Sequence, residues 1–410
     1  MPWGWKSSIP RRIFPFLSHN ICSEEGMMTE EAQVKHIQLN PIPGMEFETD
    51  GIYIRKKTYA ILLSFNGQSY QGMQVNRVTG NAIENYLLAA LLSLTLITEE
   101  EATFPQLFKF QRTSRTDKGV SAARMVVSAV LPEKMNTDNL KCELNNLLSE
   151  DIRVMAVYRV IRSFNSKLWC DGRSYSYLCP TFAFAPITER ACKDYRISDE
   201  VLGEVRRQLN LFKGSHNFHN FTSKIGANDA RAWRVINSVE CDEPFERHGW
   251  QWINIKLRGQ SFLLHQIRKM VCVLMCVCRG LASPHFITST LTTRYVDLPK
   301  APALGLVLQD QHFVTYNKTY GGDGIHEPLV WDEVEEEIQR FCDENLYDSI
   351  MKKELNENVM LKWLCCQYYH DYQTYILKHQ AKQNQDINHQ RFLQWKHLSE
   401  EVNKDDEFTM

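Results

Sequence analysis

Apolar positions along the chain recur with a period of two in some stretches and of about 3.6 in others. Runs rich in β-branched and aromatic residues predict strands at 59–65, 107–110, 125–131, 152–160, 171–177, 234–241 and 251–257. Helical spacing of apolar residues predicts helices at 82–94, 138–148, 201–212, 262–278, 331–342 and 354–369. The chain therefore interleaves strands with helices, and none of its apolar runs reaches the roughly 18 residues of a membrane span.

The polar stretch at 110–122 stands out because it lies between two of the apolar runs. It holds several cations, among them Arg112, Arg115 and Lys118, around the single acid Asp117. An Asp-Lys-Gly sequence suits a tight turn in which the glycine has positive φ. Cations near an acid also favour its ionised form, and a positioned carboxylate is what a nucleophile requires. The residues alone leave the turn and the reactive site as equal alternatives.

The sequence Arg115-Thr116-Asp117-Lys118-Gly119-Val120-Ser121-Ala122 resembles the catalytic loop of the TruA family of pseudouridine synthases, which isomerise uridine in RNA. The longer string that starts at Phe110 resembles the branch that modifies tRNA in the eukaryotic nucleus and mitochondrion. The likeness extends from about Lys56 to about Asp310. It implies that Asp117 is the catalytic aspartate, acting as nucleophile or base.

The same resemblance assigns roles to further residues of the chain. Arg268, at the start of the apolar helix, corresponds to the arginine that pairs with the catalytic aspartate. Tyr175, in Tyr-Ser-Tyr, corresponds to the ring that stacks on the target uracil. Arg115 would hold the flipped nucleotide, and Leu306, in the closing strand expected at 301–308, would line the uracil pocket. Basic residues near this site, expected to bind the substrate, are Arg173, Lys167 and Lys118.

The fold implied by the resemblance is α+β, with two lobes that each carry a mixed or antiparallel sheet flanked by helices. The lobes, 51–170 and 171–320, are expected to meet at a basic RNA-binding cleft. Residues 1–50 are expected to be a leader and linker, and residues 321–410 an acidic helical extension. Monomer and homodimer both remain open.

The distribution of charge supports an RNA-binding body. Residues 321–410 contain 9 Lys and Arg against 19 Asp and Glu, a net charge of −10. The whole chain has 47 Lys and Arg and 49 Asp and Glu. Residues 1–320 therefore contain 38 Lys and Arg and 30 Asp and Glu, a net charge of +8. A basic body with an acidic appendage fits contact with phosphates, although acidic tails also serve solubility alone.

The cysteines and histidines do not form a recognised metal site. The twelve cysteines lack paired C-x-x-C spacing, which argues against a zinc ribbon and a secreted disulfide scaffold. Cys272, Cys276 and Cys278 are expected to pack in the core as small hydrophobic residues. His216 and His219 have H-x-x-H spacing but no complete ligand set. The chemistry implied by the resemblance needs neither a metal nor a cofactor.

The leader at 1–23 contains three basic residues, four serines and no acid. This composition suits a mitochondrial presequence, and a plain disordered N-terminus is an equal alternative. Nucleus, mitochondrion or both are the expected locations.

These observations lead to one expected function and two rivals. The expected function is a pseudouridine synthase that acts on tRNA near the anticodon stem, with other structured RNAs as further substrates. The first rival is a non-catalytic RNA-binding or RNA-folding protein of the same fold. The second is a metal-dependent hydrolase that uses His216 and His219.

Overall fold

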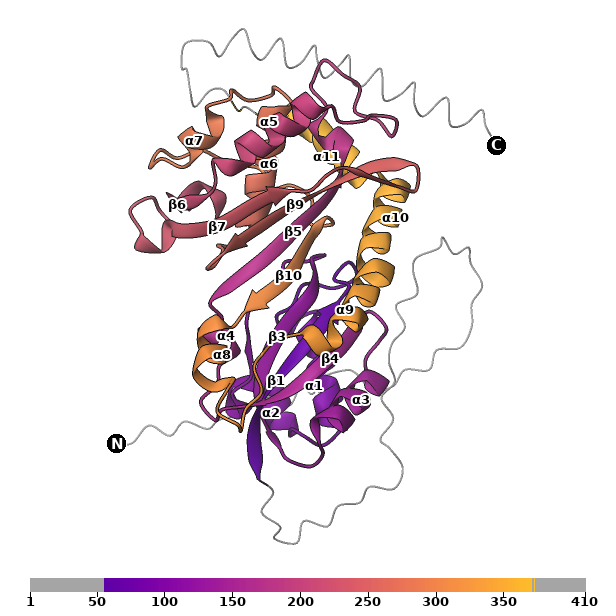
Figure 1. Ribbon diagram of the computed structural model, residues 1–410, viewed down its shortest axis with the longest axis vertical. Coiled ribbons are helices and arrows are strands. Elements are labelled where there is room, and N and C mark those ends of the chain that lie inside the picture. Colours follow the sequence, from indigo (N-terminus) through magenta and orange to yellow (C-terminus); the bar gives the residue numbers. More distant parts are fainter. Residues whose placement is uncertain (1–54, 371, 373–410) are drawn as a thin grey trace, which may run out of the picture. The chain divides into compact units, whose positions relative to one another are not determined.

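The computed structural model describes residues 55–370 and 372, and ten strands within these residues form one mixed sheet (Figure 1). The strand order is β4-β1-β3-β10-β5-β9-β7-β6, with β2 beside β3 and β8 beside β9. The strands are β1 (Lys56–Phe65), β2 (Gln111–Arg112), β3 (Ser121–Pro132), β4 (Ile152–Val160), β5 (Gly172–Pro180), β6 (Gly214–Asn217), β7 (Trp233–Cys241), β8 (Phe245–Arg247), β9 (Trp250–Gly259) and β10 (Leu306–His312). Every pair is antiparallel except β10 with β3, which run parallel.

Helices flank the sheet, so the expected α+β class is confirmed. Short helices α2 (Glu99–Thr103) and α4 (Ser166–Trp169) connect strands. The longer helices before the C-terminal segment are α1 (Ile83–Ser93), α3 (Thr137–Leu147), α5 (Asp199–Asn210) and α6 (Gln266–Cys278), followed by α7 (Phe286–Thr290) and α8 (Val314–Tyr320). α6 is almost entirely buried, which explains its nearly continuous apolar sequence. The predicted division into leader, lobes and extension stays a prediction, and the leader at 1–50 lies outside the described residues.

Strand β10 joins the two parts of the sheet. It pairs with β3 through Val307 opposite Ser121 and Leu308 opposite Ala122, and with β5 along its other edge. Residues 301–305, which the resemblance placed in this strand, instead form an irregular approach to it. The run at 107–110 is also not a strand, because Pro105 starts a 3₁₀ turn and β2 begins only at Gln111. Proline lacks a backbone N–H and favours the first positions of helical turns.

Two glycines let the loop after β1 lie directly against the stretch that contains Asp117. A Cβ on Gly67 would be 2.0 Å from the carbonyl oxygen of Val120, and one on Gly72 would be 2.4 Å from that of Thr116. The Met73 N–H donates to the Thr116 carbonyl at 3.3 Å. Gly72 also has φ of +99°, which side-chain-bearing residues rarely adopt. The backbone around Asp117 therefore depends on residues without side chains in a different segment.

An ion pair secures the start of the same stretch. Glu84, fully buried in α1, accepts from the Arg112 Nη2 at 2.8 Å and from the Val75 N–H at 2.8 Å. Burial raises the pKa of the Glu84 carboxyl, and the Arg112 guanidinium opposes this shift. Arg112 thus ties β2 to α1, and the expectation that it crowds Asp117 is wrong.

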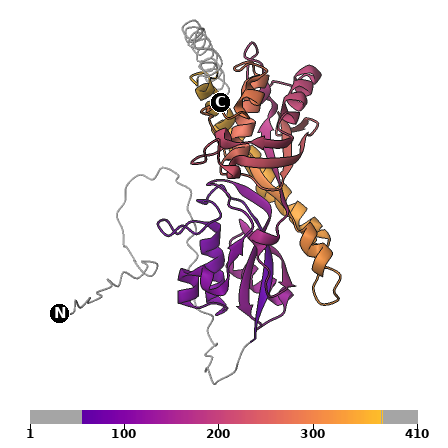
Figure 2. The same ribbon diagram turned by 90° about the vertical axis from the view of Figure 1, so that its left-hand side faces the viewer.

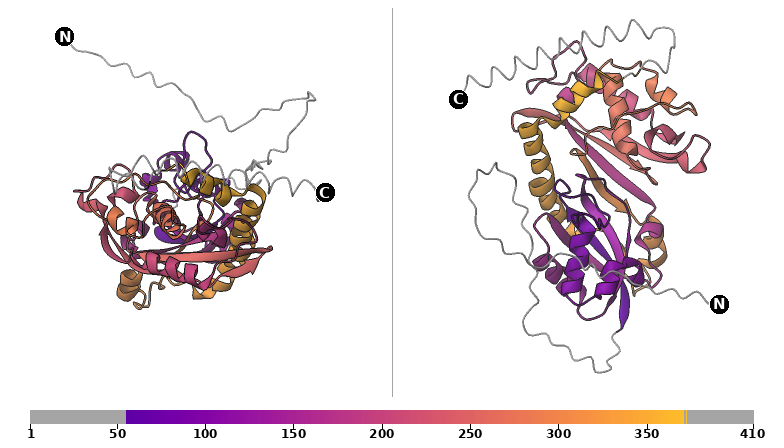
Figure 3. Two further views of the ribbon diagram at one scale, coloured as in Figure 1. Left: turned by 90° about the horizontal axis from the view of Figure 1, so that it is seen from above. Right: turned by 180° about the vertical axis from the view of Figure 1, so that it is seen from behind.

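The C-terminal segment forms α9 (Glu335–Phe341), a π-helical stretch (Cys342–Tyr347), α10 (Asp348–Glu357) and α11 (Val359–Gln367). The helix predicted at 331–342 starts with a 3₁₀ turn at Asp332–Val334 and becomes α-helical only at Glu335. The helix predicted at 354–369 is broken at Asn358, whose φ is +50°. Figures 2 and 3 show these helices alongside the sheet. Residues 373–410 lie outside the described residues.

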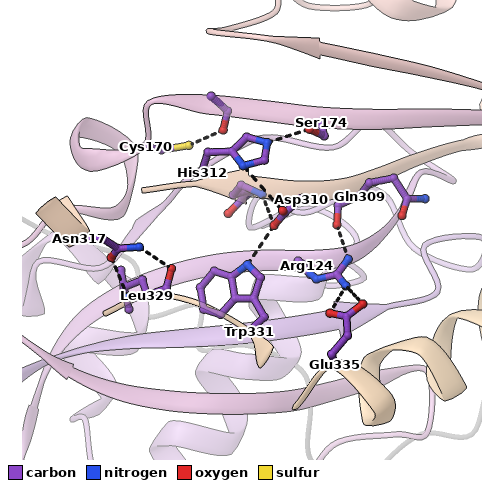
Figure 4. A network of polar contacts seen from close by, with 12 residues as sticks. Arg124, Cys170, Ser174, Gln309, Asp310, His312, Asn317, Leu329, Trp331 and Glu335 are labelled. Carbon is purple, nitrogen blue, oxygen red and sulfur yellow. Dashed lines mark hydrogen bonds and ion pairs between the residues drawn. The ribbon is translucent and has the colours of Figure 1, made fainter. Parts of the chain in front are cut away.

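Polar contacts attach this segment to strands β3 and β10 (Figure 4). Glu335 binds the Arg124 Nη2 of β3 at 2.7 Å, and the Trp331 indole N–H donates to the Asp310 carboxylate at 2.9 Å. Further along, the Trp363 indole N–H donates to the Lys300 carbonyl at 2.8 Å. The segment therefore binds β3, β10 and the loop that leads into β10.

Substitution of Gly72 by alanine should destabilise the protein by at least about 2 kcal/mol, because the new methyl group would press on the Thr116 carbonyl at an unfavourable φ. Gly203→Ala is the matched control. Gly203 lies in α5 with no atom near its Cβ position, so this change should be neutral or stabilise by up to about 1 kcal/mol. Thermal and urea unfolding measure both changes, and equal stabilities of the two variants would contradict the proposed close contact.

Glu354 in α10 should make stability depend on pH. It is buried and accepts from the Met360 N–H at 2.7 Å, and desolvation raises its pKa to about 8. Since the folded-state pKa lies above the unfolded value, the folded protein binds the proton more tightly, and stability is lost as pH rises from about 4.5 through about 8. Glu354→Gln should therefore be more stable than the wild type at pH 9, and this advantage should shrink towards pH 5. Urea unfolding across this range tests the effect, and a pH-independent difference would contradict it.

Candidate active site

Asp117 lies in a tight turn, which is one of the two alternatives that the sequence left open. The Val120 N–H donates to the Asp117 carbonyl at 3.1 Å, and Gly119 has φ of +80°. The Gly119 N–H also donates to the Tyr70 carbonyl at 3.2 Å. This turn presents the Asp117 side chain, which retains 21% of its exposure, at the start of β3.

Two residues from the start of α6 contact the Asp117 carboxylate. Arg268 Nη1 lies 3.3 Å from Asp117 Oδ2, and His265 Nδ1 lies 2.8 Å from the same oxygen. All three side chains are largely buried, with exposures of 15% for Arg268 and 21% for the other two. Ion pairs and charge-assisted hydrogen bonds are strong in such partly desolvated surroundings.

A second contact orients Arg268. Its Nε donates to the Ala301 carbonyl at 2.7 Å, and the Ala301 N–H donates back to the Arg268 carbonyl at 3.0 Å. Pro302, which follows Ala301, is held as well, because the Tyr177 hydroxyl donates to the Pro302 carbonyl at 3.0 Å. The irregular approach to β10 therefore fixes the arginine that binds Asp117.

His265 was missed by the analysis of the sequence, although it makes the shorter contact with Asp117. A signal was present, because His265 precedes Arg268 by three residues and such positions share one side of a helix. The left-handed conformation of His265, with φ of 66°, could not be read from the sequence.

Tyr175 lies on β5, close enough to Asp117 for the carboxylate to act on its pKa. Its ring packs edge to face on Phe262 at a centroid distance of 5.1 Å and is 8% exposed. Burial raises the pKa of the Tyr175 hydroxyl, while a hydrogen bond with Ser114 and the nearby Arg173 oppose the shift. Tyr175 of β5 and Asp117 in the turn before β3 thus lie in one neighbourhood.

Arg173 contacts the Asp117 stretch through the backbone. Its Nη2 donates to the Thr113 carbonyl at 3.1 Å and its Nε to the Ser114 hydroxyl at 3.3 Å, while Nη1 donates to the Gln260 carbonyl at 2.8 Å. The guanidinium donors therefore brace the polar stretch against the loop before α6. The structure shows this bracing for a residue that the sequence placed among the substrate-binding groups.

The remaining predicted residues differ in their surroundings. Leu306 is 7% exposed at the start of β10, opposite Tyr177 of β5. Arg115, Lys118 and Lys167 are exposed. Within residues 55–370 and 372, the side chains of Lys118 and Lys167 form no hydrogen bond or ion pair, which leaves both ammonium groups accessible to phosphates.

The histidines considered as metal ligands are engaged elsewhere. The His216 Nε2 lies 2.9 Å from the Lys213 carbonyl, and the His219 Nδ1 lies 3.1 Å from the Asn217 amide oxygen. Among the described residues, no group of three or more His, Cys, Asp or Glu is arranged to hold a metal ion. Cys272 and Cys276 are buried in α6, as predicted, and no described helix is long and apolar enough to cross a membrane.

The chain is similar to known proteins over most of its length. Residues 209–314 match the family model described as tRNA pseudouridine synthase. The chain is 41% identical over 327 residues to the pseudouridylate synthase 1 homolog of Mus musculus, covering 79% of this chain and 76% of the relative. It is 42% identical to the Homo sapiens protein of the same name, and the match covers 74% of this chain and 71% of the relative. Identity to tRNA pseudouridine synthase 1 of Yarrowia lipolytica is 30%, and the match covers 74% of this chain and 72% of the relative.

The level of identity and the coverage of both chains decide the assignment. These relatives are matched over most of their own length, and the match with the family model includes Arg268, His265 and Leu306. Asp117 and Tyr175 lie before that segment in the sequence, and the sheet brings them to it. The chain belongs to the TruA family of tRNA pseudouridine synthases.

Proposed function

We propose that this protein converts uridine to pseudouridine in tRNA and that Asp117 is the group that acts on the target nucleoside. The observation that carries the proposal is the carboxylate of Asp117, held by Arg268 and His265 and close to Tyr175. A held carboxylate has a clear use in this reaction, whereas a surface that only binds RNA gains nothing from an acid, which repels phosphates.

The reaction breaks the C1′–N1 bond, turns the uracil and joins C5 to C1′. Asp117 assists in one of two ways: it attacks C1′ or the base, or it removes the 2′ proton so that a glycal forms. In either case the proton on C5 is lost and N1 gains one, so the product is an isomer of the substrate. Because the base stays in the pocket, the reaction needs neither a metal nor a cofactor.

Other residues have roles in binding and orientation. The target must leave its stack before its atoms can be reached, and Arg115, which is exposed, holds it in that state. Tyr175 stacks on the uracil, Leu306 forms an apolar wall, and Lys118 and Lys167 bind phosphates. Arg173 contributes through the loop that it braces. Stacking on an aromatic ring stabilises a bound base by about 1–3 kcal/mol.

The finer features of the function are also proposals. We infer that the targets include uridines near the anticodon stem and that other structured RNAs are further substrates. The protein acts as a monomer or homodimer. Location in the nucleus, the mitochondrion or both is supported by the relation to eukaryotic tRNA-modifying enzymes and by the basic, serine-containing leader. Microscopy of the full chain and of a chain starting at Met28 tests the leader, which loses its proposed role if both show the same distribution.

Replacement of Asp117 by asparagine should abolish the reaction, because an amide of equal size offers neither a nucleophile nor a base. Tritium release from tRNA labelled at uracil C5 should fall at least about a thousandfold, while the dissociation constant for tRNA should change by less than about threefold. Asp138→Asn, an exposed carboxylate near the start of α3, is the control and should keep full activity. Tritium release by pure Asp117→Asn protein at the wild-type rate would overturn the assignment. Absence of release from the wild type, with tRNA still bound, would favour the RNA-binding rival.

A further inference from the structure

The two oxygens of the Asp117 carboxylate have different surroundings. Arg268 Nη1 and His265 Nδ1 both contact Oδ2, at 3.3 Å and 2.8 Å. Among residues 55–370 and 372, none makes a hydrogen bond to Oδ1. One oxygen is therefore anchored by the protein, and the other remains available to a substrate.

Arg268 alone is a weak constraint on the orientation of this carboxylate. Its contact is the longer of the two, and its Nε is committed to the Ala301 carbonyl. The χ2 angle of an aspartate has a broad and roughly twofold distribution. The two carboxylate oxygens therefore exchange places easily unless contacts restrain both the χ2 angle and the position of the carboxylate. A second donor on Oδ2, from a different residue, restrains this rotation.

The position of His265 is itself well determined. It adopts φ of 66° and ψ of 2° at the start of α6, where its carbonyl accepts from the Lys269 N–H at 3.1 Å. Two hydrogen bonds between Gln266 and Leu263 close the preceding loop. The Leu263 backbone N–H donates to the Gln266 side-chain oxygen at 2.8 Å, and the Gln266 backbone N–H donates to the Leu263 carbonyl at 3.1 Å. A left-handed conformation in a residue other than glycine, asparagine or aspartate is unfavourable, and it persists where the surroundings enforce it.

The chemistry of the contact determines the direction of the hydrogen bond. An ionised carboxylate only accepts, so Nδ1 of His265 carries the proton in this contact. The imidazole therefore acts here as a donor to Oδ2, whichever state Nε2 adopts. General acid or base chemistry at Nδ1 would require this hydrogen bond to be broken.

We propose that His265 is a positioning residue that, together with Arg268, fixes Oδ2 so that Oδ1 faces the target nucleoside. Oδ1 is then the oxygen that attacks or removes the proton in the reaction. This inference rests on the proposed function, since it names the reacting atom of the same carboxylate.

Four variants at position 265 separate the backbone from the hydrogen bond. Asparagine tolerates the left-handed conformation and offers an amide donor one bond beyond Cγ, near the place of the histidine Nδ1. Glycine keeps the conformation and removes the donor, and aspartate keeps the conformation but adds a repelling carboxylate. Glutamine keeps a donor but is disfavoured in that conformation.

The full chain of each variant is assayed for single-turnover tritium release, tRNA dissociation constant and thermal midpoint. We expect His265→Gly to lower the single-turnover rate by about 10- to 100-fold, the effect of losing a hydrogen bond to a charged group. His265→Asp should lower it further, and His265→Asn should restore it to within about fivefold of the wild type. The dissociation constant for tRNA should stay within about threefold throughout, because the contact does not touch the RNA backbone. His265→Gln should lie between glycine and asparagine, with a reduced thermal midpoint.

Several results would overturn the inference. A wild-type rate for His265→Gly would show that the contact does not position Asp117. An asparagine variant as slow as the glycine variant would show that the imidazole itself is required, for proton transfer rather than orientation. Weakened tRNA binding with an unchanged single-turnover rate would assign His265 to substrate binding. A wild-type protein without tritium release would instead refute the proposed function, so the two failures are distinguishable.

A double-mutant cycle provides an independent check on the shared oxygen. Arg268→Met and His265→Gly remove two donors to one atom, so their effects on the single-turnover rate should be strongly non-additive. Once either residue has been replaced, the Asp117 side chain can already rotate about χ2. Replacing the other residue should then lower the single-turnover rate by less than a third of the factor by which it lowers the rate of the wild type. Additive effects would show that the two residues act through different parts of the site.

Discussion

The anchoring of one carboxylate oxygen by the start of α6 is the interaction on which the site depends. Asp117 is presented by a turn before β3, while Arg268 and His265 follow about 150 residues later. Charged groups that lose water are stable only when they are paired and hydrogen-bonded. The pair thus connects the two parts of the sheet at the site proposed for the chemistry.

The surroundings of Asp117 show how the protein keeps this turn in place without using the carboxylate itself. Gly67 and Gly72 let one loop lie against its backbone, Arg112 ties its first strand to Glu84, and Arg173 braces it against the loop before α6. None of these contacts uses the Asp117 carboxylate, and several are made to backbone atoms. The carboxylate proposed to react is therefore supported by contacts that leave it unengaged, which is an arrangement that favours precise orientation.

The C-terminal segment supports the same region from outside. Its attachments to Arg124, Asp310 and the Lys300 carbonyl lie on β3, on β10 and in the loop that leads to β10. That loop holds Arg268 through Ala301. Acidic residues such as Glu335 and Glu337 pair with Arg124 and Lys141 of the body, so part of the opposite charge of the two segments is used in structural ion pairs. The remaining basic side chains, such as Lys118 and Lys167, stay available to RNA.

Local pattern sufficed for most elements and for the recognition of the family. Strand β4 and helix α1 appeared at their predicted places, because alternation and helical spacing of apolar residues report directly which side of an element is buried. The Asp117 loop and Arg268 were recognised from short motifs. Residues 107–110 were misassigned because their apolar content reflects burial around a 3₁₀ turn, which a periodicity argument cannot distinguish from a strand. The resemblance placed 301–308 in one strand, whereas only the part from Leu306 onward is extended.

Other features were decided only by the tertiary structure. Arg112 is a cation of the reactive loop by sequence, yet a buried glutamate from α1 captures it. Arg173 was expected to bind substrate, and its donors brace the loop. His265 reaches Asp117 because its backbone adopts φ of 66°, a conformation that the surrounding loop enforces. By itself the sequence determined most of the elements that form and the family that the chain resembles, and it predicted that Asp117 is the reacting acid. The fold alone decided which donors meet that acid and which of its oxygens they leave free, because long-range pairing depends on where each strand enters the sheet and no local pattern records it.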